Sequence, residues 1–385
     1  LTVDGVRRDL TDPNFKSYFI YARGPAMPEL KAQPATDAQG QWLLDVAKMV
    51  RWTQSSSAAL MAGWSFLAPV CGALNWRPHI WITGKAGSGK SHIMEHFCQK
   101  LQSGIGEAVA GGDSSEAGIR QTLGADAVPV TLDEIEPNDE QDRARLKKIL
   151  TMIRQSSVES SARTLKGTVS GESMQFHVRS MFALASINTM LDKDSDASRI
   201  SVLVIRPPAG NNDKTDRWVE LDAALASIGD DHEWPARLMA RALAMLPTIL
   251  ANVAVFVKVA AKRFGSQRAG DQFGTLMAGA WCLCRSDVAT ATDAEAMFNS
   301  YDWTENTTDQ GPDDPQQALN SVLGAKLKVN MTDLTVFELV GAASGVRPVD
   351  IVLQSTAADV LNRNGLRIID KHLVFGTSTP ALKAL

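Results

Sequence analysis

The sequence GKAGSGKS (residues 84–91) places three glycines and two lysines directly after the apolar run HIWIT (residues 79–83). Its spacing fits the pattern G-x-x-x-x-G-K-[ST]. Glycines at these positions let the backbone bend tightly, so that successive N–H groups point inward around an anion. A helix that begins near Lys90 adds the positive end of its dipole. The stretch therefore predicts a phosphate-binding P-loop between a buried strand and a helix.

Each position of this loop has an expected role. Lys90 is expected to reach the β- and γ-phosphates of a nucleotide, and the Ser91 hydroxyl to hold Mg²⁺. The alternative is a chance glycine-rich turn, which the preceding strand and the following helical pattern of Met94, Phe97 and Leu101 disfavour. ATP and Mg²⁺ are the predicted cofactors. The predicted nucleotide-binding residues of the loop are Gly84, Lys85, Ala86, Gly87, Ser88, Gly89, Lys90 and Ser91.

A second stretch, VPVTLDEIE (residues 128–136), has the form of a buried strand that ends in two carboxylates, the Walker B form. Asp133 is expected to bind Mg²⁺ together with Ser91, and Glu134 to orient and polarise the attacking water as the general base. A pair of acidic residues is otherwise often only the solvated start of a loop. Two further apolar strands are predicted, one ending at Asn188 and one following Arg199.

The segments WRPHIWITGKAGSGKS, GGDSSEAGIRQTL, PVTLDEIEPND, FALASIN and DASRI occur in this order. Together they resemble the AAA+ ATPases, and more narrowly the helicase portion of phage- and mobile-element-encoded primase–helicases, the superfamily 3 group and its relatives. The resemblance implies a ring-forming, hexameric ATPase that acts on single-stranded or forked DNA. It implies that Asn188 is sensor 1, which holds the lytic water, and that Arg199 is an arginine finger acting on the neighbouring subunit's nucleotide. A primase or polymerase domain or protein is a further candidate partner.

Composition is that of a globular chain of two or three domains, with 385 residues, 44% apolar and 21% charged. A net charge of −4 excludes a strongly basic protein that coats nucleic acid, but not a ring that threads DNA with a few cations per subunit. The apolar runs at residues 58–74 and 242–257 contain Pro, Gly or Asn and are expected to be core helices rather than membrane spans. The four scattered cysteines indicate neither a metal site nor a disulfide framework, and we expect a cytoplasmic protein.

Five regions are predicted along the chain. Residues 1–36 form an N-terminal arm, and residues 37–75 two helices that resemble a collar, for which oligomer contact and plain packing are both open. Residues 76–208 alternate strands and helices, which indicates a three-layer α/β core with a parallel sheet. Residues 209–310 are predicted to be a helical lid. Residues 311–385 have a winged-helix outline of three helices, the hairpin LRIIDKHLVF and a short helix; their balanced charge leaves protein contact and a DNA role open.

Several basic residues are candidates for ligand contact. Arg237 and Arg241 lie four apart on one helix face, and the resemblance implies that either is the sensor 2 arginine on the γ-phosphate; the alternative is a surface arginine. Residues 162–178 predict a hairpin, with strands at 164–169 and 174–178. The resemblance implies that this hairpin is aimed into the channel of the ring. Arg163 and Lys166 on its first arm are predicted to contact DNA phosphates, or else are merely solvated.

The function expected from these features is that of an ATP-dependent DNA helicase or translocase of a phage or mobile-element replication system, which hydrolyses ATP at the subunit interfaces of a ring. The alternative is a replication initiator or helicase loader that uses ATP as an assembly switch and unwinds little. A small-molecule kinase is a third possibility, but it would need an acceptor site and normally lacks the pair Asn188 and Arg199.

Overall fold

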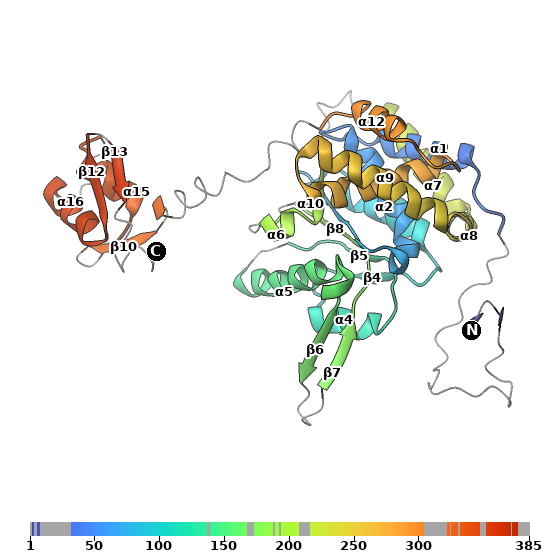
Figure 1. The fold of residues 1–385 in the computed structure, drawn as a ribbon, viewed down its shortest axis with the longest axis horizontal. Coiled ribbons are helices and arrows are strands. Elements are labelled where there is room, and N and C mark those ends of the chain that lie inside the picture. The colour runs from blue at the N-terminus through green and yellow to red at the C-terminus, as the bar shows by residue number, and fades with distance from the viewer. Residues whose placement is uncertain are drawn as a thin grey trace. The chain divides into compact units, whose positions relative to one another are not determined.

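The computed structural model divides the chain into two compact units, Leu1–Trp303 and Thr304–Leu385 (Figure 1). The residues that the structure describes are 2–3, 6–7, 32–136, 139–167, 173–187, 189–191, 194–207, 216–303, 322–323, 325–329, 332–346, 352–370 and 372–375. Within the arm, β1 (Thr2–Val3) pairs with β2 (Val6–Arg7).

The centre of the first unit is a five-stranded sheet in the order β4-β5-β8-β3-β9, in which every neighbouring pair is parallel. This confirms the parallel α/β sheet that the sequence predicted. The apolar runs form strands because both faces of the sheet are covered, so that β3 and β8 are buried along their whole length. The strands are β3 (His79–Thr83), β4 (Ala108–Ala110), β5 (Val130–Leu132), β8 (Phe182–Ser186) and β9 (Ile200–Val204).

Alternate side chains of β3 enter two separate hydrophobic clusters, as the two-residue period of a strand requires. Ile80 and Ile82 belong to one cluster and Trp81 to the other. The Trp81 cluster includes Leu123 of α4 (Glu116–Leu123) and Leu150 of α5 (Glu140–Ser156). The sheet is therefore the middle of three layers, with α4 and α5 on one face (Figure 1).

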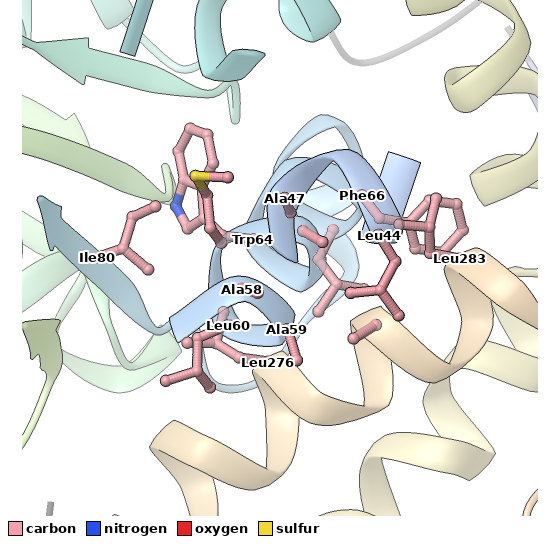
Figure 2. Close-up of a cluster of buried hydrophobic side chains, with 14 of the residues drawn as sticks. Leu44, Ala47, Ala58, Ala59, Leu60, Trp64, Phe66, Ile80, Leu276 and Leu283 are labelled. Carbon is pink, nitrogen blue, oxygen red and sulfur yellow. The ribbon is translucent and has the colours of Figure 1, made fainter. Parts of the chain in front are cut away.

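The other face of the sheet is covered by helices from both ends of the first unit. Figure 2 shows Ile80 of the sheet beside Trp64 and Leu60, with Leu276 and Leu283 of a later helix in the same cluster. These helices are α1 (Asp37–Met49), α2 (Ser56–Leu67), η1 (Ala68–Ala73), α7 (Asp216–Asp230), α8 (Trp234–Ala244), α9 (Leu246–Phe264), α10 (Gln267–Ala269), the π-turn η6 (Gly270–Gly274), α11 (Thr275–Cys284) and α12 (Ala291–Asn299).

Two glycines bring α2 and α11 into backbone contact. A Cβ on Gly63 would lie 1.9 Å from the carbonyl oxygen of Leu276, and a Cβ on Gly279 would lie 2.6 Å from that of Gly63. All twelve residues of α2 are buried. The stretch Ser56–Ala73 is long and apolar enough to cross a membrane, but 89% of it is buried inside the protein, as expected for a core helix.

The remaining elements of the first unit include the predicted hairpin. β6 (Arg163–Gly167) pairs antiparallel with β7 (Ser173–His177), so both strands begin one residue earlier than predicted. Asp139 caps α5, because its side chain accepts a hydrogen bond from the Asp142 backbone N–H. The P-loop helix consists of α3 (Lys90–Ile93), η2 (Met94–Gln99) and η3 (Lys100–Gln102), and short turns form η4 (Glu159–Ser161) and α6 (Asp194–Ala197).

The second unit has its own hydrophobic core, which includes Leu327, Leu339 and Leu361. The predicted hairpin in LRIIDKHLVF is confirmed as β12 (Leu366–Ile369) and β13 (His372–Phe375). A second hairpin, β10 (Lys326–Val329) with β11 (Thr332–Thr335), was not predicted, although the alternation of exposed and buried residues in β10 is typical of a strand. Between the hairpins lie α15 (Val336–Ala343) and α16 (Gln354–Arg363).

Candidate functional site

The glycine-rich loop follows the carboxyl end of β3, and two of its glycines are required by close approaches. A Cβ on Gly84 would lie 2.6 Å from the carbonyl oxygen of Ile205, at the end of the neighbouring strand. Gly89 has a φ of 93°, in the left-handed region, and a Cβ there would lie 2.9 Å from the Trp218 ring. The loop therefore has the tight turn that the sequence predicted.

The side chains of Lys90 and Ser91 lie at this loop. The Lys90 ammonium donates to the carbonyl oxygens of Gly84 and Lys85, at 3.0 and 3.3 Å. The Ser91 hydroxyl lies 3.4 Å from a carboxylate oxygen of Asp133. Lys90 and Ser91 follow β3, and Asp133 follows β5. The structure thus brings the three residues together from the ends of two strands that are not adjacent in the sheet.

The backbone bends sharply at Glu134, directly after Asp133. Glu134 has a φ of 58°, which is unusual for a residue with a Cβ, and its N–H donates to the Asp133 side chain at 2.8 Å. Gly112 of the GGDSS segment allows this bend, because a Cβ there would lie 2.3 Å from the Glu134 carbonyl oxygen. The bend leaves the Glu134 side chain exposed at the same edge of the sheet as the P-loop.

Glu136, which was not among the residues predicted from the sequence, also stabilises this edge of the sheet. Its carboxylate accepts a hydrogen bond from the backbone N–H of Ile187, the residue before Asn188. The Thr83 hydroxyl donates to the Ile187 carbonyl at 2.8 Å. Both bonds fix the chain where β8 ends; Asn188 itself lies outside the described residues. The sequence could have indicated this role only through the presence of an acidic residue two positions after Glu134. The residue that Glu136 contacts, Ile187, is 51 residues away.

A cavity of about 320 Å³ adjoins the P-loop. It combines apolar side chains with the Trp218 ring and two arginines, one of which, Arg206, donates to the Thr53 carbonyl at 2.7 Å. His92 of the P-loop helix contacts Asp222 of α7 at 2.9 Å and so ties α7 to this helix. The lining residues are Met49, Val50, Arg51, Gly87, Ser88, Gly89, Ile93, Ile205, Arg206, Trp218 and Leu221.

The residues at this edge fit a nucleotide with Mg²⁺. The glycine turn and Lys90 offer donors to phosphate oxygens, and a hydroxyl with one carboxylate suits Mg²⁺, which usually keeps water and phosphate ligands as well. Among the described residues there is no group of three or more His, Cys, Asp or Glu side chains that would hold a metal by itself.

Arg199 lies at the opposite edge of the sheet. Its carbonyl accepts from the His79 N–H at the amino end of β3, whereas the P-loop follows the carboxyl end. At a rise of about 3.3 Å per residue, the Arg199 backbone is therefore about 17 Å from Gly84. The guanidinium lies over the Trp76 ring at 5.6 Å, and its Nη1 donates to the Ser195 carbonyl at 2.5 Å.

The structure does not bring Arg237 or Arg241 to the P-loop. The Arg241 side chain is buried and donates to the carbonyls of Ala35 and Cys282 and to the Asp37 carboxylate. Arg237 forms ion pairs with two neighbouring carboxylates, those of Asp231 and Glu233.

The predicted DNA-contacting residues belong to β6, which pairs Arg163 with His177 and Lys166 with Met174. Their side chains lie outside the described part of the structure. The base of the hairpin is anchored through Glu159, which contacts His177 at 3.0 Å and the buried Arg77 at 3.2 Å.

Comparisons with known proteins add little. No family model and no curated protein matches the chain. Two solved structures of the NrS-1 C terminal region are similar, with TM-scores of 0.35 and 0.32, at 15% and 12% identity. The matches cover 81% and 79% of this chain, and 78% and 76% of the other chains. At these scores the likeness defines neither the fold nor the function of this chain.

Proposed function

We propose that this chain is an ATP-dependent DNA helicase or translocase of a phage or mobile-element replication system, and that it hydrolyses ATP at the subunit interfaces of a ring. The observation that carries the proposal is the convergence of Lys90, Ser91, Asp133 and Glu134 on one edge of a parallel sheet. This combination provides charge for the phosphates, oxygen ligands for a hard cation and a carboxylate for the water.

Each of these groups has a distinct task in the proposed reaction. Lys90 binds the phosphate oxygens, and its position over the carbonyls of Gly84 and Lys85 keeps it at the loop. Ser91 and Asp133 hold Mg²⁺, which supplies charge stabilisation when bound. Glu134 is placed by the bend at its own backbone and orients the attacking water as general base. Glu136 holds the end of β8, from which Asn188 follows.

The cavity beside the P-loop supports a nucleotide rather than inorganic phosphate as the ligand. Ile93, Ile205, Leu221 and Trp218 give it apolar walls next to Gly89, so that a flat base fits beside a phosphate chain in the loop. A cavity of about 320 Å³ lies within the range of about 300–1,000 Å³ that is usual for small-ligand pockets.

Action on DNA is supported by cations on α5 and by the hairpin β6–β7. Arg143, Lys147 and Lys148 are exposed on α5, where they are available to phosphates. The hairpin is fixed at its base by Glu159 and is therefore a defined projection from the sheet.

The test is strand displacement on forked DNA with ATP and Mg²⁺, with ATP hydrolysis measured in the same samples. ATP-dependent unwinding by the wild type and its loss in Lys90→Ala would support the helicase. Hydrolysis without unwinding would favour the loader or initiator. Phosphate transfer to a small acceptor, without stimulation by DNA, would favour a kinase.

A further inference from the structure

The cavity beside the P-loop lies on the side of β3 away from the Walker B strand. In the order β4-β5-β8-β3-β9, Asp133 follows β5 on one side of the loop. Ile205 and Arg206, which line the cavity, follow β9 on the other side. The contact between Ser91 and Asp133 places Mg²⁺ and the terminal phosphates towards β5. The opposite end of a nucleotide, its base, therefore lies towards β9 and the cavity.

The cavity presents one aromatic ring, that of Trp218 on α7. The ring lies against the P-loop, because a Cβ on Gly89 would be 2.9 Å from it. It is held beside His92 of the P-loop helix, with 5.3 Å between the ring centroids, and His92 contacts Asp222 of α7 at 2.9 Å. Trp218 is still 39% exposed. A fixed, accessible ring next to the phosphate loop suits stacking on a base, and stacking by itself does not select one base over another.

The polar groups that line the cavity are mainly donors. The segment after α1 runs beside the end of β9, where the Arg206 N–H donates to the Arg51 carbonyl at 2.8 Å. Both arginines line the cavity. The Arg206 guanidinium is fixed by one hydrogen bond, from Nη2 to the Thr53 carbonyl at 2.7 Å. A guanidinium has several further N–H groups and no acceptor, so it recognises acceptor atoms of a ligand.

Acceptors are scarce among the described residues that line the cavity. Ser88 alone of them has a side-chain oxygen, and that oxygen is buried. The carbonyls of Val50 and Arg51 already accept hydrogen bonds, from the N–H groups of Trp52 at 2.9 Å and of Arg206 at 2.8 Å. The 6-amino group of adenine is a donor, whereas O6 and N7 of guanine are acceptors that one arginine binds together. The cavity therefore offers more partners to guanine than to adenine.

We propose that this site binds guanine nucleoside triphosphates at least as tightly as ATP, with Trp218 stacked on the base and Arg206 donating to its acceptor edge. The inference rests on the proposed function and names the substrate class of the same site, which is purine nucleoside triphosphates rather than ATP alone. Arg206 is assigned to the base and not to the terminal phosphate because β9 and β5 lie on opposite sides of β3.

The experiment measures the binding of GTP, ATP and inorganic tripolyphosphate by calorimetry in the presence of Mg²⁺. The wild type is expected to have a Kd for GTP no larger than that for ATP. Trp218→Ala should weaken both nucleotides by about tenfold or more, the loss of one stacked base, and leave tripolyphosphate unchanged. Trp218→Phe should recover part of the loss. The control Trp42→Ala removes a tryptophan of similar exposure, 37%, that does not line the cavity.

Arg206→Ala provides the second readout. It should weaken GTP by about tenfold, and ATP less, because adenine has no O6 for the guanidinium. Tripolyphosphate should bind as in the wild type. The control is Lys262→Ala, which removes an exposed cation from the last turn of α9. Arg206 and Trp218 are both exposed, so the variants are expected to fold.

Three results would contradict these expectations in different ways. A wild type that binds ATP more tightly than GTP would overturn this inference and leave the proposed function intact. An equal loss of GTP, ATP and tripolyphosphate in Trp218→Ala or Arg206→Ala would do the same, since the residue would then serve the phosphates and not the base. A wild type that binds neither nucleotide nor tripolyphosphate would overturn the proposed function and this inference with it.

Discussion

The two edges of the central sheet place their charged and polar side chains in different environments. At the carboxyl edge, glycines and a bent backbone leave Glu134 exposed beside Lys90 and the P-loop cavity. At the amino edge, Arg77 and His79 are fully buried and their hydrogen bonds are made within the protein. Parallel strands separate these two environments, because all carboxyl ends meet at one edge and all amino ends at the other. The carboxyl edge is open to a ligand, whereas the amino edge holds Arg77 and His79 in buried contacts.

Removing the P-loop cation has the largest expected effect. Lys90→Ala should abolish ATP binding and hydrolysis, because Lys90 meets phosphate charge already in the ground state. Binding of a fluorescent ATP analogue would be measured beside the control Lys262→Ala. Normal binding by Lys90→Ala would mean that the carboxyl edge is not the nucleotide site.

The next largest effect is expected at the opposite edge. Arg199→Ala should bind ATP normally but lose about 10³-fold in kcat, the size of an arginine-finger effect. Equilibrium binding and steady-state hydrolysis on the same preparation separate the two steps. A variant with wild-type kcat would leave the amino edge without a role in hydrolysis.

Glu134→Gln tests the proposed role of Glu134 as the general base at the carboxyl edge. The amide keeps the shape of the side chain but no longer accepts the water's proton, so kcat should fall by about 10²- to 10⁴-fold with binding retained. Glu295→Gln, an exposed carboxylate of α12, is the control. Normal hydrolysis by Glu134→Gln would remove its assignment as the base.

Substitutions in the hairpin β6–β7 are expected to have a smaller effect, which is limited to DNA binding and unwinding. The double variant Arg163→Ala, Lys166→Ala should bind single-stranded DNA more weakly and show a salt dependence whose logarithmic slope is shallower by about 1.4, for two lost phosphate contacts. Salt titrations of DNA binding measure this slope. Unchanged unwinding and an unchanged slope would place the DNA contact elsewhere.

The last prediction concerns stability at the amino edge, which near neutral pH changes little. Burial, and next the charges of Arg77 and Arg199, lower the pKa of His79 to about 3. The neutral ring accepts from the Phe182 N–H through Nδ1, a bond that protonation would break. Since the unfolded chain takes up this proton near pH 6.5, stability should fall as the pH drops from about 6.5 towards 3, by up to about 1.4 kcal/mol per pH unit. The free energy of unfolding of His79→Gln should depend less steeply on pH than that of the wild type. The same pH dependence in both proteins would contradict this prediction.

The sequence predicted the elements whose signal is local. The P-loop turn needs glycine at fixed positions, and the apolar strands β3, β5 and β8 show their burial in composition alone. What it missed depends on contacts between distant segments. Nothing near Arg241 indicates that Asp37, 204 residues away, occupies its guanidinium, and nothing near Gln272 indicates Ser201. The hairpin β10–β11 was missed although it is local, because its strands KLKV and TDLT contain fewer apolar residues than the strands LRII and HLVF of the hairpin that was predicted.

The most direct test of the central claim, that the two edges of neighbouring subunits complete one ATPase site, is hydrolysis by mixed subunits. Lys90→Ala and Arg199→Ala subunits are each expected to be inactive, and their mixture to recover activity, because some interfaces then pair an intact P-loop with an intact Arg199. A matched control mixes Arg199→Ala with the double variant Lys90→Ala, Arg199→Ala, which offers no complete interface. Recovery in the first mixture alone is the predicted result. No recovery in subunits that demonstrably assemble together would contradict the claim.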